Sequence, residues 1–276
     1  FFWGMLYGIG GTAFGLAIRY IGFSLTYAIS VGISCVLGTL LPPLYEGKLA
    51  TILQGSGGNV IVTGIAAGAI GIILCGWAGR LKEKDYEDQQ REKSGYSFSI
   101  GIALCILAGV LSAFYGFALF RGQPIADVAA KYGAGYFQGN IIYIFSNTGA
   151  FVTTALYCIY LHSKQKTWKE YKTILPENTG NAKWLGMNYG LAILTGILWY
   201  TQFFFYGLGH TRMGAYKFTS WAIHMIMLVL ISAVIGIVLK EWTGVKKHTT
   251  RMLTFALIIL VAAVLIITYG NYLGGN

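Results

Sequence analysis

The apolar stretch 198–210, LWYTQFFFYGLGH, carries aromatic and hydrogen-bonding side chains where plain aliphatic ones would suit a lipid environment. Trp199, Gln202 and Tyr206 follow at steps of three and four residues, which places them on one face of a helix. Asn188 and Thr195 extend this face, which we expect to point into the protein. Aromatic rings cover apolar C–H surfaces, and an amide both donates and accepts hydrogen bonds. The face is therefore typical of a site for a neutral hydroxylated ligand with one apolar side.

Other apolar segments carry similar polar stripes. Asn140, Tyr143 and Asn147 share a face of the segment 139–161, and Trp221 lies at the start of the segment 219–239. Inside a membrane such side chains face cavities or partner helices. A single one could simply join two helices, at about 1 kcal/mol, but together they predict a pocket. The candidate substrate-binding residues are Trp199, Gln202, Tyr206, Asn147, Tyr143, Asn140 and Trp221.

Three titratable residues are candidates for carrying a proton. His224 can titrate near neutral pH and shares a helix face with Ser220, although a lone histidine is often structural. His210 lies at the outer end of its segment, and Glu241 lies at the inner end of the next one, where it also fits a plain ion pair with a neighbouring lysine. The sequence has no Walker loop, HExxH, GxSxG or CxxC motif, so we expect no metal and no cofactor.

The segments that position these residues are long and apolar. The chain is 55% hydrophobic and 11% charged, which predicts an all-α polytopic membrane protein with at least eight spans. The predicted spans are 1–18, 23–43, 59–78, 97–120, 139–161, 184–206, 219–239 and 251–272.

The formal charge of +10 follows the membrane topology. Fifteen of the 20 lysines and arginines fall in alternate connections, including 80–93, 164–183 and 240–251. Lys48, Arg121, Lys131, Arg212 and Lys217 fall in the others. This positive-inside pattern predicts that the first group is cytoplasmic, and it favours a lipid bilayer over nucleic acid as the partner.

The polar segment 80–96 predicts a cytoplasmic linker between two repeats. Three predicted spans precede it, in residues 1–79, and five follow it, in residues 97–276. The chain begins with FFWG inside an apolar segment and without Met, so we expect two upstream helices to be missing. Two five-helix repeats would then have inverted topologies, as in many secondary transporters.

The stretch 198–206 together with Gly209-His210, Ser220-Trp221, His224-Met225 and 239–242 (LKEW) resembles the bacterial L-rhamnose/proton symporter family of the drug/metabolite transporter superfamily. The resemblance implies ten helices in two inverted repeats, with this chain starting at helix three. It also implies proton-driven uptake of a 6-deoxy sugar across the bacterial cytoplasmic membrane. Lys217 departs from the family pattern, which has an acidic residue just before the seventh span of this chain.

The leading hypothesis is therefore a sugar importer with protons as the coupling ion. Trp199 and Tyr206 would stack on the sugar, Asn147 and Gln202 would bind its hydroxyl groups, and His224 would respond to protonation. One alternative is an exporter or exchanger of small amphipathic metabolites, and another is a membrane-embedded enzyme or sensor.

Overall fold

The computed structural model describes residues 1–87, 98–172, 182–213 and 217–275, which form helices and short connections without a β-strand. The long helices are α1 (Phe2–Ile21), α2 (Phe23–Tyr45), α4 (Gly58–Glu87), α5 (Phe98–Lys131), α6 (Asn140–Gln165), α7 (Ala182–Thr211), α8 (Thr219–Val238) and α9 (Lys247–Gly275). The short helices are α3 (Leu49–Gln54), η1 (Gly135–Phe137) and η2 (Thr167–Tyr171). The all-α prediction is confirmed.

Seven of these helices, α2 and α4 to α9, are long and apolar enough to cross a membrane. The remaining predicted span, 1–18, coincides with α1, which is helical but is not in this group. Its glycines, Thr12 and Arg19 lower the hydropathy of the segment.

Several helices run further than the sequence predicted. Pro124, which lies beyond the predicted span 97–120, is inside α5, and Pro42 and Pro43, at the end of the predicted span 23–43, are inside α2. α4 continues to Glu87, so residues 80–87 of the predicted linker are helical, with Arg80 bonded to Glu83 at 3.3 Å. Residues 88–96 of that linker lie outside the described part of the chain.

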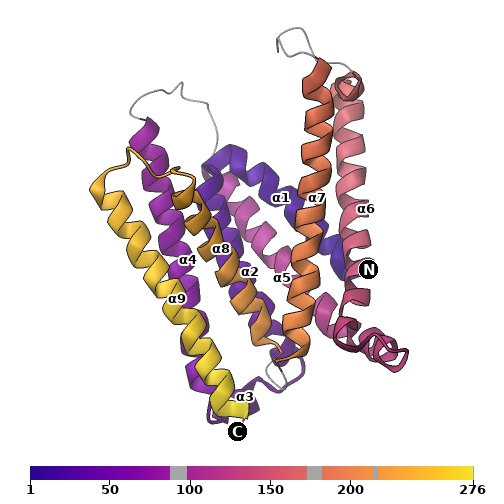
Figure 1. Ribbon diagram of the computed structural model, residues 1–276, viewed down its shortest axis with the longest axis vertical. Helices are drawn as coiled ribbons and strands as arrows, with labels where there is room; N and C mark the ends of the chain where they lie inside the picture. The colour runs from indigo at the N-terminus through magenta and orange to yellow at the C-terminus, as the bar shows by residue number, and fades with distance from the viewer. Residues whose placement is uncertain (88–97, 173–181, 214–216, 276) are drawn as a thin grey trace.

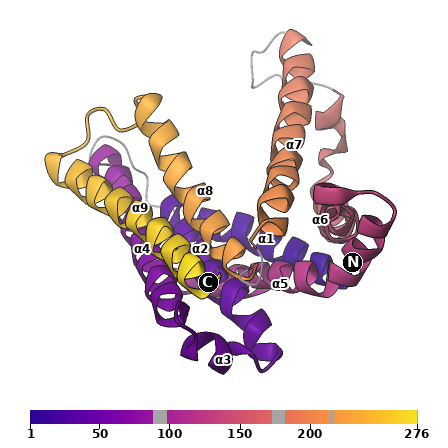
Figure 2. The same ribbon diagram turned by 60° about the horizontal axis from the view of Figure 1, so that its bottom comes forward.

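The helices pack in two groups around a shared centre (Figure 1). α4 packs along α9, α5 packs against α1 and α2, and α6 covers α1. α7 contacts α6, η1 and α8, and both views show its first half extending away from α8 and α9 (Figure 2). The buried core joins the groups through side chains such as Tyr115 of α5 and Trp221 of α8.

One end of the molecule carries α3, the C-terminal ends of α2, α5 and α7, and the start of α8 (Figure 1). Lys48, Arg121 and Lys217, predicted to lie outside the membrane, are at this end. The last turn of α4 and the α8–α9 connection lie at the opposite end. The two groups of basic residues defined from the sequence are therefore separated along the long axis.

Candidate functional site

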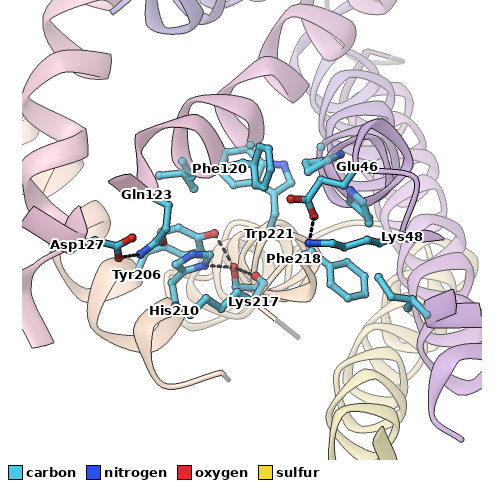
Figure 3. A pocket seen from close by; sticks show the side chains of 17 residues that line it. Glu46, Lys48, Phe120, Gln123, Asp127, Tyr206, His210, Lys217, Phe218 and Trp221 are labelled. Carbon is cyan, nitrogen blue, oxygen red and sulfur yellow. Dashed lines mark hydrogen bonds and ion pairs between the residues drawn. The ribbon is translucent and has the colours of Figure 1, made fainter. Parts of the chain in front are cut away.

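A cavity of about 460 Å³ lies at the end that carries α3 (Figure 3). It is bordered by α2, α3, α5, α7 and the start of α8. Its aromatic lining consists of Phe120, Tyr206, Phe218 and Trp221, and its polar lining consists of Glu46, Lys48, Gln123, Asp127, His210, Lys217 and Ser220. Small-molecule sites have this size and this combination of apolar wall and few polar groups.

Trp221 closes the deep end of this cavity, the outer cavity. Its side chain is 2% exposed, and its Nε1 donates a hydrogen bond of 3.0 Å to the carbonyl oxygen of Ser34. A Cβ on Gly38 would contact the same Nε1, so only glycine leaves room for the indole at this point of α2. The ring stacks on Tyr115 with a centroid distance of 5.7 Å.

An aromatic cluster continues behind Trp221 into the protein centre. The ring of Tyr115 lies 4.7 Å from Tyr7 and 5.1 Å from Phe203, between centroids. Its hydroxyl donates to Oδ1 of Asn147 at 2.7 Å and accepts from Ser146 at 3.2 Å. Helices α1, α5, α6, α7 and α8 therefore meet through one connected set of rings and polar tips.

The predicted residues of α6 join this cluster. Tyr143 is 2% exposed and lies 5.6 Å from Phe203, between ring centroids. Nδ2 of Asn147 and Oδ1 of Asn140 are buried and have no hydrogen-bond partner among the described residues. Buried polar atoms are almost always satisfied, so these two are available to a ligand or a water molecule.

The structure divides the predicted stripe of α7. Tyr206 lines the outer cavity, and Gln202 lines a second, lateral pocket. Trp199 is 42% exposed, with its ring 5.0 Å from Phe203, and Asn188 and Thr195 are exposed. Residues 186–200 of α7 are all exposed, and in this part of the helix Tyr189 donates to the carbonyl oxygen of Tyr171 in η2 at 2.6 Å.

The lateral pocket, of about 590 Å³, lies between α7 and α8. His224 borders it and packs against the ring of Tyr206 at 4.8 Å and the ring of Trp221 at 5.8 Å. His224 makes no hydrogen bond to a described residue. The wall between the two pockets contains Tyr206, His210 and Ser220, which border both.

Ser220 connects three groups in that wall. Its Oγ lies 2.7 Å from the hydroxyl of Tyr206 and 2.7 Å from Nδ1 of His210, and it donates to the carbonyl of Lys217 at 2.6 Å. Ser220 and His224 both border the lateral pocket, as their shared helix face predicts, and the hydrogen bond of Ser220 across to α7 goes to His210.

Glu241 is remote from both pockets described above. It lies at the opposite end of the molecule, where its carboxylate is 3.5 Å from the ammonium group of Lys82. The Lys82 ammonium also lies 4.7 Å from the ring centroid of Trp242. Glu241 therefore belongs to an ion pair, as one interpretation of the sequence held, with Lys82 of α4 as a partner.

The comparisons with known proteins identify the chain's family. The family model described as L-rhamnose-proton symport protein (RhaT) matches residues 1–272. The chain belongs to this family.

Several relatives carry the same name. The L-rhamnose-proton symporters of Mannheimia succiniciproducens, Escherichia coli O1:K1 and Klebsiella pneumoniae are 32%, 30% and 30% identical to this chain. Each alignment covers 98% of this chain and 77% of the relative. No solved structure matches the chain. As a member of the L-rhamnose-proton symport family with seven helices able to cross a membrane, the chain is a multi-pass membrane protein and a transporter rather than an enzyme.

Sequence reasoning missed part of the cavity and of the aromatic cluster behind it. Tyr115, in that cluster, is the only tyrosine in the predicted span 97–120, a weak signal that was available. Glu46, Gln123 and Asp127 lie beyond the ends of the predicted spans, where polar and charged residues are ordinary. The described residues contain no group of three or more His, Cys, Asp or Glu placed to bind a metal ion.

Proposed function

We propose that this protein imports L-rhamnose or a similar 6-deoxy sugar together with protons, by alternating access. Membership of the L-rhamnose-proton symport family carries this proposal. The relatives named as L-rhamnose-proton symporters align over 98% of the chain, including the residues that line the outer cavity.

The outer cavity has the chemistry that such a sugar requires. A 6-deoxy sugar has apolar C–H faces, a methyl group and several hydroxyl groups, and it carries no charge. Trp221, Phe218 and Phe120 offer apolar ring surfaces, which bind C–H groups by dispersion and burial. Gln123 and Asp127, joined at 2.8 Å, offer further donors and acceptors. A carboxylate and an amide together can satisfy two neighbouring hydroxyl groups.

The buried atoms behind Trp221 supply a deeper part of the proposed pathway. Nδ2 of Asn147 is a donor without a partner, and Oδ1 of Asn140 is an acceptor without a partner, among the described residues. Gln202 borders the lateral pocket on the other side of Tyr206. We assign these amides to hydroxyl binding after the sugar has passed Trp221, and Trp199 and Tyr206 to stacking on its apolar face.

The helix packing supports two inverted five-helix repeats, as in the drug/metabolite transporter superfamily. With two helices upstream, α2 and α4 would be the fourth and fifth helices of the first repeat, and α8 and α9 those of the second. A two-fold axis between repeats brings equivalent helices together. α4 does pack along α9, and α2 packs against α8.

The charge distribution orients this arrangement in the bacterial cytoplasmic membrane. The positive-inside rule places the end with α3 and the outer cavity outside the cell. The cavity then receives the sugar from outside, and sugar and proton must both bind one state more tightly than the other to drive the change of access.

Uptake of labelled L-rhamnose into proteoliposomes tests the function. We expect accumulation when the outside is acidic, and its collapse when a protonophore is added. Protein-free liposomes and labelled D-glucose are the controls. Uptake that does not depend on the proton gradient would contradict proton coupling. A failure to take up L-rhamnose would contradict the proposed substrate.

A further inference from the structure

The hydrogen bonds of Ser220 determine where its neighbours carry their protons. A serine hydroxyl has one hydrogen to donate and two lone pairs that accept. The Lys217 carbonyl can only accept, and it lies 2.6 Å from Ser220 Oγ. The single hydrogen of Ser220 is therefore used there. Both lone pairs are then left for Tyr206 and His210, each at 2.7 Å.

This count fixes the tautomer of His210. Because Ser220 has no second hydrogen, Nδ1 of His210 must carry the hydrogen of their shared bond. A neutral imidazole has one protonated nitrogen and one free lone pair, so the lone pair lies on Nε2. Nε2 makes no hydrogen bond to a described residue. A proton can therefore bind Nε2 without breaking any contact of Ser220.

The charged groups around His210 come from every wall of the outer cavity. Lys217 precedes α8, Asp127 lies on α5, and the ion pair of Glu46 and Lys48, at 3.2 Å, lies at the end of α2. Tyr206, on the same helix, packs its ring 5.8 Å from the imidazole. His210 thus shares one cavity with two carboxylates and two lysines, and Figure 3 shows them around the same space.

We propose that His210 takes up the transported proton at Nε2, and that Ser220 is the positioning residue that directs the proton to that atom. The proposal rests on the proposed function. A hydronium ion on the outer side gives its proton to Nε2, leaving water and an imidazolium. Water on the inner side later accepts that proton, and the neutral ring is restored.

Protonation of His210 also explains why a proton would raise sugar affinity. The imidazolium gains a donor at Nε2 in the cavity that contains Trp221 and Gln123, and a charge-assisted bond to a sugar hydroxyl is stronger than a neutral one. By linkage, bound sugar raises the affinity of His210 for the proton by the same factor.

The two other candidates fit this role less well. Glu241 is paired with Lys82 at the end opposite to the outer cavity. His224 borders only the lateral pocket and has no hydrogen bond that selects one of its nitrogens. His210 borders both the outer cavity and the lateral pocket, so its ring is reachable from both faces of the wall between them.

The decisive variant is His210→Asn, because an asparagine amide can still donate to Ser220 but cannot titrate. Proteoliposomes containing the whole protein are given L-rhamnose, and proton uptake is followed with an internal pH dye. The apparent KM is measured from outside pH 6 to 8. For the wild type we expect sugar-driven proton uptake and a KM that rises about tenfold with pH, within the usual range of such couplings. For His210→Asn we expect no sugar-driven proton uptake and a KM that changes less than about twofold.

Three further variants complete the test. Ser220→Ala keeps the imidazole, so we expect proton uptake to persist with a different pH dependence of KM. His224→Asn should keep the wild-type pH dependence. The exposed His248→Asn serves as the matched surface control.

The outcomes distinguish a failure of the His210 assignment from a failure of the proposed symport. Wild-type pH dependence in His210→Asn, or its loss in His224→Asn, would overturn the assignment to His210. Loss of L-rhamnose exchange, measured without a proton gradient, together with loss of proton uptake in His210→Asn would make His210 essential to sugar movement itself and would overturn its assignment as the proton carrier. A wild type that takes up L-rhamnose without protons would instead overturn the proposed symport.

Discussion

At the scale of single residues, the hydroxyl of Tyr115 holds the amide of Asn147 by a hydrogen bond. Tyr115 is fully buried, and its hydroxyl donates to Oδ1 of Asn147. With Oδ1 as the acceptor, Nδ2 is left without a partner among the described residues. Ser146 Oγ lies 3.2 Å from the same hydroxyl and 3.0 Å from the carbonyl oxygen of Ile142. A donor held in this way is available to the sugar at a low entropic cost.

Tyr115→Phe tests that arrangement. The ring stays but the bond to Asn147 is lost, and a hydrogen bond of this kind contributes about 1 kcal/mol, which is roughly a fivefold change in binding. We expect the apparent KM for L-rhamnose to rise by about that factor while sugar-driven proton uptake remains. Tyr269→Phe, on an exposed ring of α9, is the matched control. An unchanged KM would remove Asn147 from the sugar site.

At the scale of elements, α4 and α9 form the tightest pair. A Cβ on Gly64 would lie 2.9 Å from the backbone nitrogen of Ile267, closer than packed atoms approach, so glycine lets the two backbones meet. Asp85 at the end of α4 adds a polar link, because its carboxylate accepts from the Lys246 backbone at 3.0 Å and from Thr249 at 2.6 Å. These bonds join the end of α4 to the start of α9, because Lys246 directly precedes α9 and Thr249 lies in its first turn.

Gly64→Leu should separate this helix pair. Overpacking of a close contact costs about 1–3 kcal/mol, and we expect a clearly lower unfolding temperature in detergent. The matched control is Gly190→Leu on α7, where a Cβ meets no atom within 4 Å. That control should unfold at the wild-type temperature or slightly above it, because leucine favours a helix more than glycine does. Equal effects of both changes would contradict close α4–α9 packing.

At the scale of the whole molecule, the two ends differ. The outer cavity reaches Trp221 from the end with α3, whereas ion pairs join the helices at the other end. Lys82 pairs with Glu241, and Lys246 pairs with Asp85 at 3.3 Å. These contacts hold α4 to the α8–α9 connection. In the alternating-access cycle proposed above, we expect these contacts to loosen before the sugar leaves on that side.

Exchanging the charges of Lys82 and Glu241 tests whether this ion pair takes part in the transport cycle. Lys82→Glu and Glu241→Lys each place like charges together, and an exposed pair contributes up to about 1 kcal/mol. We therefore expect each single variant to change the initial L-rhamnose uptake rate by about twofold to fivefold. The double variant should restore much of the wild-type rate. A double variant that adds the two single effects would show that the pair does not act together in the cycle.

The sequence by itself determined which segments are helices and which end of each carries positive charge. Hydropathy and helical periodicity are local properties, and lipid leaves the backbone no alternative to internal hydrogen bonds. Each predicted span therefore coincides with a helix, and only the bounds moved, at Pro124 and near Glu87. The aromatic face of 198–206 and the polar face of α6 were visible for the same reason.

Only the tertiary structure decided which of those faces meet. Tyr206 and Trp221 reach one cavity, but Trp199, on the same predicted face of α7 as Tyr206, lines neither pocket and stays 42% exposed. The spacing placed Ser220 and His224 on one face, which borders the lateral pocket, but only the packing of α8 on α7 showed that Ser220 bonds to His210. Contacts between residues on different helices depend on how the helices cross and on their depth, and no local pattern in the chain encodes these quantities.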